Sequence, residues 1–152
     1  MPGTGTRTRT EITQRIAADP TSTALLLAGP TAFELWPGVR RIEDVNGGVL
    51  VETTLATDVT VAANVRALPP QRTPTSFVTR FTWSGPGLPT TVGELTLTNA
   101  PSEAGERSTL AGLVLDSEGL EFSTLNECSL TAMAREFLSN LARAAELRNR
   151  AA

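Results

Sequence analysis

LNECSLTAMAREFLSNLARAAELRN, residues 125–149, has the period of one long amphipathic helix. Its apolar residues recur every three or four positions and therefore share one stripe. The stripe consists of Leu130, Met133, Ala134, Phe137, Leu138, Leu141, Ala144 and Ala145. Thr124 and Glu127 have the spacing of a capping box, which marks the start of the helix. At about 1.5 Å per residue the helix is about 35 Å long, enough to cross a small sheet.

The sequence before this helix indicates mostly short strands. Residues 8–16 form the first strand, and Asp19 and Pro20 then supply an N-cap and a first helical residue. A second short helical turn is expected over residues 31–35, ended by Trp36-Pro37-Gly38. The remaining strands are expected at residues 39–45, 49–57, 58–68, 75–84, 91–99 and 107–116, separated by turns rich in Gly, Pro and Asn. Asn46-Gly47-Gly48 is a strong hairpin signal, and successive antiparallel pairing is the simplest topology.

Length and composition limit the classes of protein to consider. The chain has 152 residues, which fits one domain over residues 8–150 after a mobile lead-in at residues 1–7. The net charge is −3, so a nucleic-acid partner is not indicated. No apolar run approaches the roughly 18 residues of a membrane helix, so we expect no stable membrane insertion. The lone Cys128 excludes an internal disulfide and fits a reducing, cytoplasmic location.

The residue types also restrict the chemistry. The chain has no His and no Tyr, and all 13 basic residues are Arg. Ser–His and Cys–His nucleophile pairs are therefore excluded, as is a Lys Schiff base. The usual His and Cys ligand sets for zinc are missing as well. We expect no metal and no cofactor.

An aromatic row stands out in residues 75–84. With the period of a strand, Phe77, Thr79, Phe81 and Trp83 share one face and Arg80 lies on the other. Such a row either lines a pocket for a flat apolar ligand or forms an ordinary core between sheet and helix. The indole N–H of Trp83 needs a polar partner in either arrangement.

The order of these elements resembles the helix-grip fold of the START-like (SRPBCC) superfamily. Within it, the chain resembles the bacterial polyketide cyclase/dehydrase and coenzyme Q-binding-type proteins. The resemblance is carried by Ala17-Ala18-Asp19-Pro20, by Leu35-Trp36-Pro37-Gly38-Val39, by Asn46-Gly47-Gly48 and by the final helix. It implies an α+β fold, in which a curved antiparallel sheet of about seven strands wraps around a long C-terminal helix. Two short helices follow the first strand, and a deep hydrophobic cavity lies between sheet and helix.

The resemblance implies that this cavity binds a small hydrophobic molecule, such as a polyketide, a quinone, a lipid or an aromatic metabolite. The expected ligand-binding residues are Trp36, Phe77, Thr79, Phe81, Trp83, Met133, Phe137 and Leu141. Trp36 lies either at the cavity mouth or as a plug that packs the small helices onto the sheet. Three residues of the final helix are expected to lie in the core, on the cavity floor or in both: Met133, Phe137 and Leu141.

Two other functions stay open at this point. The first is a polyketide aromatase/cyclase that uses an inward Arg, with Arg66, Arg80 and Glu94 as candidate catalytic residues. Strand alternation instead favours a solvated Arg66 and a cross-strand pair of Arg80 with Glu94 on the outer face. The second is a ligand-free interaction or assembly module, which would have a filled core and an exposed apolar patch. A homodimer is compatible with each function.

Overall fold

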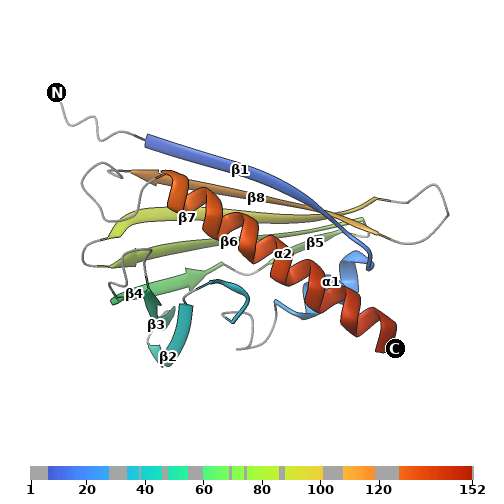
Figure 1. The fold of residues 1–152 in the computed structure, drawn as a ribbon, viewed down its shortest axis with the longest axis horizontal. Helices are drawn as coiled ribbons and strands as arrows, with labels where there is room; N and C mark the ends of the chain where they lie inside the picture. Colours follow the sequence, from blue (N-terminus) through green and yellow to red (C-terminus); the bar gives the residue numbers. More distant parts are fainter. Residues whose placement is uncertain are drawn as a thin grey trace.

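The structure, a computed structural model, describes residues 7–27, 34–37, 39–45, 48–54, 60–68, 70–73, 75–85, 88–100, 108–118 and 127–151. Its elements, in chain order, are β1 (Arg7–Ile16), α1 (Pro20–Leu25), β2 (Val39–Val45), β3 (Gly48–Thr54), β4 (Thr60–Ala67), β5 (Gln71–Thr73), β6 (Ser76–Gly85), β7 (Leu88–Asn99), β8 (Thr109–Glu118) and α2 (Glu127–Ala151). Figure 1 shows α2 crossing one face of the sheet diagonally, with α1 beside its C-terminal half.

The strands form one antiparallel sheet in the order β1-β8-β7-β6-β4-β3-β2, with β5 paired to β6 beside this path. The N-terminal strand β1 pairs with the last strand β8 along its whole length, from Arg7 opposite Glu118 to Ile16 opposite Thr109. Each other neighbour on the path comes from a nearby part of the chain. The α+β helix-grip architecture expected from the sequence is confirmed.

The boundaries differ from the expectation in a few places. Arg7 is already part of β1, and residues 1–6 of the expected lead-in lie outside the described residues. Of the expected second helical turn, Glu34 and Leu35 form a short 3₁₀ turn and residues 31–33 lie outside the described residues. Residues 124–126 of the expected capping box also lie outside them. The short strand β5 was not expected at all.

The first helix begins as the sequence predicts. Asp19 is the N-cap residue, and its Oδ1 accepts a hydrogen bond of 2.6 Å from the backbone N–H of Ser22. Pro20 occupies the first helical position, where its missing N–H costs nothing. Thr23 and Ala24 are buried, so α1 turns one side toward the core and forms one wall beside the sheet.

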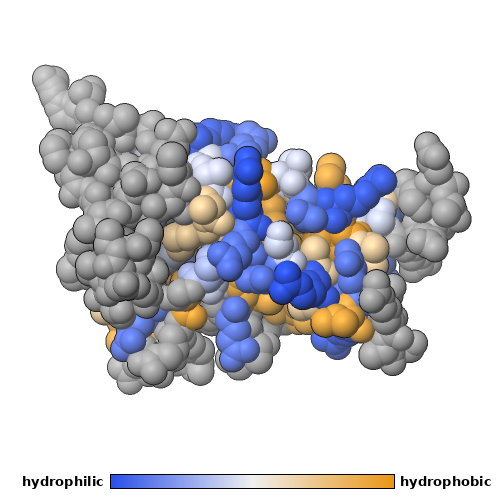
Figure 2. Space-filling model, viewed as in Figure 1, coloured by the Kyte–Doolittle hydropathy of each residue, from blue (hydrophilic) through white to orange (hydrophobic). Residues whose placement is uncertain are grey.

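The long helix α2 is held to the sheet by its apolar stripe and by polar contacts near each end. Phe137, Leu138 and Leu141 are buried. Thr131 Oγ1 lies 3.5 Å from Thr10 Oγ1 of β1, and the backbone N–H of Ala17 donates to Glu146 Oε2 at 3.1 Å. Figure 2 shows hydrophilic side chains along the outward side of α2 with hydrophobic ones in the gaps beside it. No helix within the described ranges has the length and apolar character needed to span a bilayer.

The buried side chains form two clusters. The larger cluster joins β1, β6, β7, β8 and both helices, and its fully buried members include Leu95, Leu113 and Leu138. The smaller cluster consists of Val51, Ala63 and Trp83, on the strands near the β2 edge. Met133 of α2 packs against both clusters. The core is therefore divided, and the aromatic row of β6 extends from one cluster to the other.

Candidate functional site

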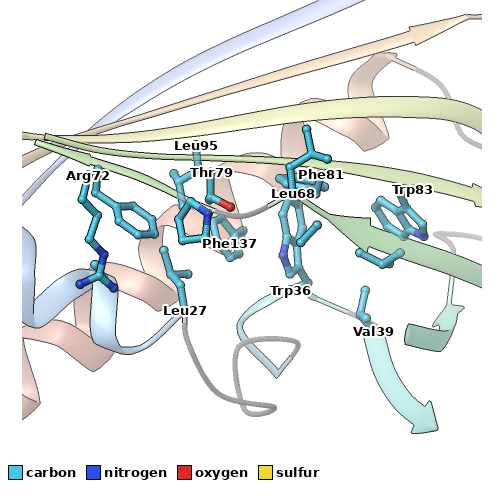
Figure 3. Close-up of a pocket in the computed structure, with 15 residues that line it drawn as sticks. Leu27, Trp36, Val39, Leu68, Arg72, Thr79, Phe81, Trp83, Leu95 and Phe137 are labelled. Carbon is cyan, nitrogen blue, oxygen red and sulfur yellow. The ribbon is translucent and has the colours of Figure 1, made fainter. Parts of the chain in front are cut away.

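A cavity of about 400 Å³ lies between the sheet, the two helices and the 34–37 turn. This volume is within the usual range for small-molecule sites, which is roughly 300–1,000 Å³. Six of the residues expected to bind a ligand line the cavity: Trp36, Phe77, Thr79, Phe81, Trp83 and Phe137. Figure 3 shows Thr79, Phe81 and Trp83 along one strand, with Trp36 and Phe137 facing them.

The structure differs from the expectation for Met133 and Leu141, which are not among the cavity-lining residues. Leu141 lies one turn after Phe137 and is fully buried in the larger cluster. Met133 lies one turn before Phe137 and packs between the two clusters. A helix crossing a sheet diagonally presents only about one turn to a cavity of this size, and here that turn holds Phe137.

Trp36 is the centre of an aromatic cluster inside the cavity. Its ring stacks on Phe137, with 4.2 Å between ring centroids and 20° between planes. It meets Phe81 edge-on at 5.9 Å and Trp83 at a tilt at 6.0 Å. Trp36 therefore joins the 34–37 turn to both α2 and β6, as in the plug arrangement considered from the sequence, and it also lines the cavity.

A hydrogen bond holds the turn that carries Trp36. Asn140 Nδ2 of α2 donates to the carbonyl oxygen of Leu35 at 2.8 Å. Asn140 lies one turn after Phe137, so the same side of α2 supplies both the ring under Trp36 and the donor to the preceding residue. The position of Trp36 in the cavity thus depends on two adjacent contacts with the helix.

Replacing Asn140 with Asp keeps the shape of the side chain and removes this donor. We expect the free energy of unfolding to fall by about 1–2 kcal/mol, since the carbonyl of Leu35 loses its partner and meets a carboxylate oxygen. In a Trp83→Phe background, the emission of Trp36 should shift to longer wavelength. Ser139→Ala, at an exposed neighbouring position, should change neither quantity. Unchanged emission and stability in Asn140→Asp would show that the bond does not hold the turn.

Gly93 explains why the sheet leaves room for a cavity at this point. Gly93 on β7 is paired with Phe81 on β6. A Cβ atom placed on Gly93 would lie 2.1 Å from Cζ of Phe81, so the phenyl ring occupies the space that a side chain would take. With its ring over the glycine, Phe81 lines the cavity and keeps 5.9 Å between its centroid and that of Trp36.

The mouth of the cavity lies where the strand next to β6 is interrupted. β4 pairs with β6 as far as Ala67 opposite Phe81, and β5 resumes the pairing at Gln71 opposite Val78. The sequence between them contains Pro69-Pro70, which have no N–H to donate to a strand. Leu68 is 61% exposed and lines the cavity together with Pro70. The break in the strand therefore coincides with the solvent-exposed part of the lining.

Arg72 is a cavity-lining residue that the sequence analysis missed. It lies on β5, opposite Phe77 on β6, and its guanidinium carbon is 5.4 Å from the centre of the Phe77 ring. Only the Pro74-Thr75 pair separates β5 from β6 in the sequence. Proline cannot adopt the positive φ that the usual two-residue hairpin turns require, so the sequence carries no hairpin signal that would place Arg72 there. A three-residue strand is too short to show a period of its own.

The three candidate catalytic residues lie on the outer face, away from the cavity. Val65 and Ala67 line the cavity, so the exposed Arg66 between them points to the opposite side. Arg80 Nε donates to Glu94 Oε2 at 2.7 Å across β6 and β7. This is the outer-face pair that strand alternation predicts. The alternative of an inward Arg66 or Arg80 is therefore wrong, because each residue has the phase of the solvent face that strand alternation favours.

Trp83 has a buried polar atom without a partner. The side chain is 6% exposed, and Nε1 makes no hydrogen bond in the described part of the chain. Figure 3 shows Trp83 at the end of the cavity near Val39, with its ring nitrogen on the side away from Thr79. An unsatisfied buried donor costs roughly 1–3 kcal/mol.

Replacing Trp83 with Phe removes the unpaired donor and keeps most of the ring. We expect the free energy of unfolding to change by less than about 1.5 kcal/mol, since relief of the donor offsets part of the lost packing. Trp36→Phe, which leaves the donor of Trp83 in place, is the matched control and should lose more stability. Urea unfolding followed by circular dichroism measures both. A loss above about 3 kcal/mol for Trp83→Phe would mean that the indole N–H is satisfied.

The fold is shared with solved structures of low sequence identity. A START superfamily protein from Mycobacterium smegmatis is 17% identical, with a TM-score of 0.56 over 92% of this chain and 95% of that one. The Zhui aromatase/cyclase from a Streptomyces species is 16% identical, with a TM-score of 0.63 over 95% and 97%. Norcoclaurine synthase from Thalictrum flavum is 12% identical, with a TM-score of 0.64 over 97% and 99%.

No protein-family model matches the chain, and no curated protein matches it by sequence. Identities this low show the fold and not the activity. The chain has the START-like helix-grip fold over nearly its whole length.

Proposed function

We propose that the protein binds a small hydrophobic molecule, such as a polyketide, a quinone, a lipid or an aromatic metabolite, in the cavity between the sheet and α2. The observation that supports this most is the aromatic-lined cavity of about 400 Å³. Five aromatic rings from three separate elements line the space: Trp36, Phe77, Phe81, Trp83 and Phe137. Such rings offer large, rigid apolar surfaces to a flat ligand.

The polar groups of the lining are few, as in many small-molecule sites. The hydroxyl of Thr79 is beside the aromatic row, and Figure 3 shows its oxygen close to the middle of the lining. We propose that Thr79 orients one polar atom of the ligand, while the surrounding apolar side chains supply most of the binding free energy. Trp36, which stacks on Phe137 and follows Leu35, the residue bonded by Asn140, covers the ligand from the side of α2.

The alternative of a ligand-free module predicts a filled core, and the cavity favours binding over it. The alternative of a cyclase was based on Arg66 or Arg80, and both lie on the outer face. The Arg that does line the cavity is Arg72, and the described lining offers no Asp or Glu beside it for acid–base chemistry, so binding has the better support. We therefore propose a binding protein in preference to an enzyme.

A native mass spectrum of the purified protein, followed by a thermal-shift screen with quinones, fatty acids and aromatic polyketides, tests this function. A co-purifying small molecule, or a rise in melting temperature with one chemical class, is the outcome that we expect. Neither a bound mass nor a shift with any class would contradict the proposal. The same native mass spectrum gives the mass of the intact assembly and so tests the homodimer considered from the sequence.

A further inference from the structure

Charge is distributed unevenly around the cavity. Among the described lining residues, Arg72 is the one that carries a charge, and the others apart from Thr79 are apolar or aromatic. Figure 3 shows Arg72 at one end of the lining and Trp83 at the other, with Thr79 and Phe81 between them. A ligand that fills this space therefore meets a cation at one end only.

The position of Arg72 leaves its N–H groups available. Its guanidinium carbon is 5.4 Å from the centre of the buried Phe77 ring, a cation–π contact that places the group beside the cavity lining and uses none of its N–H donors in a hydrogen bond. The donors of a guanidinium lie at its edges and match the two oxygens of a carboxylate. Among the side chains that the structure describes, Arg72 forms no ion pair; the pairs Arg9–Glu11 and Arg80–Glu94 do not include it.

A second, polar pocket of about 340 Å³ adjoins the cavity at this end. Ala24, Arg72 and Phe77 line both spaces, and Thr73, Thr75 and Ser76 line the polar one. The polar pocket also contains Asp19, whose carboxylate would repel an anion placed deep inside it. An anionic group is therefore best accommodated at the junction, on the side of Arg72 that faces the cavity.

We propose that the ligand is an amphipathic acid, with its carboxylate on the edge of the Arg72 guanidinium and its apolar body along β6 toward Trp83. This inference rests on the proposed binding function and narrows its ligand class. The lining extends from Phe77 to Trp83 along one strand, which corresponds to roughly 20 Å at about 3.3 Å per residue. The body that fits is accordingly long and narrow.

A comparison of decanoic acid with decan-1-ol at neutral pH tests the proposal. The two probes have the same chain length and differ in the charged head group. Their binding is followed by tryptophan emission, since both tryptophans of the chain line the cavity and neither probe absorbs. We expect the acid to bind about 5- to 10-fold more tightly than the alcohol, the range for a partly exposed charge-assisted hydrogen bond.

Arg72→Gln should remove this preference. The affinity for decanoic acid should fall by the same factor, and the affinity for decan-1-ol should stay unchanged. Arg66→Gln is the matched control: it makes the same change of charge on the neighbouring strand β4, on the outer face, and should leave both affinities unchanged. Raising the NaCl concentration to 1 M provides a readout that needs no variant, because it screens an exposed ion pair and should weaken only the acid.

Equal binding of acid and alcohol by the wild-type protein, independent of salt, would overturn the assignment of Arg72 while leaving the binding function intact. A preference for the acid that survives in Arg72→Gln would overturn it as well. Failure of both probes, together with a negative quinone and polyketide screen, would overturn the binding function and this inference with it.

Discussion

Replacing Phe137 with Ala is expected to lower the free energy of unfolding by about 3–5 kcal/mol, the range for a buried phenyl group. Phe137 is 3% exposed and belongs to the larger core cluster. Its ring also stacks on the ring of Trp36, with 4.2 Å between the two centroids. A stacked pair of this kind adds about 0.5–1.5 kcal/mol to the free energy of unfolding. The variant should therefore lose both core packing and the support of the cavity lining.

Phe137→Leu separates these two contributions, because it keeps most of the apolar volume and removes the stacking partner. We expect it to cost about 1–2 kcal/mol, well below the alanine variant. Chemical unfolding followed by far-ultraviolet circular dichroism is the suitable measurement, since the emission of Trp36 changes with its neighbour. A cost below about 1 kcal/mol for Phe137→Ala would contradict the position of this ring in the core.

Replacing Gly93 with Ala should abolish ligand binding and cost about 1–3 kcal/mol of stability, the usual range for overpacking. The new Cβ would lie 2.1 Å from Cζ of Phe81, so the ring has to leave its place over the strand. The ring then moves into the space shared with Trp36, whose centroid is only 5.9 Å away. The methyl group added at position 93 thus closes the cavity by displacing the ring of Phe81 into it.

Gly112→Ala is the matched control for this prediction. Gly112 lies on the neighbouring strand β8, and a Cβ atom added there would meet no atom within 4 Å. That variant should bind as the wild type does and be equally stable or slightly more so. Phe81→Leu combined with Gly93→Ala should recover part of the lost stability. Wild-type binding by Gly93→Ala alone would contradict the role given to this pair.

The architecture could be predicted from the sequence because its elements carry strong local signals. The stripe of α2 identified Phe137, Leu138 and Leu141 as buried, and the alternation in β6 placed Phe77 and Trp83 on the inner face. Asp19 and Pro20 marked the start of α1 in the same way. Each signal comes from the period of its own element and needs no knowledge of distant contacts.

The site could be predicted only in part, because its details depend on how elements meet. The stripe of α2 does not reveal which turn faces the cavity, and so Met133 and Leu141 were grouped with Phe137. The role of Gly93 depends on a pairing with Phe81 across two strands. Arg72 could not be predicted, because β5 is too short to show a pattern. Arg66 and Arg80 were candidate catalytic residues because of their residue type alone.

Tryptophan emission during a ligand titration gives the sharpest test of the proposed cavity. The chain has two tryptophans and no tyrosine, and both Trp36 and Trp83 line the cavity, so the whole signal comes from the site. With at least one class among quinones, aromatic polyketides and fatty acids, we predict a saturable change in emission that is lost in Gly93→Ala. No change with any class, or a linear change equal to that of free N-acetyltryptophanamide, would contradict a ligand-binding cavity.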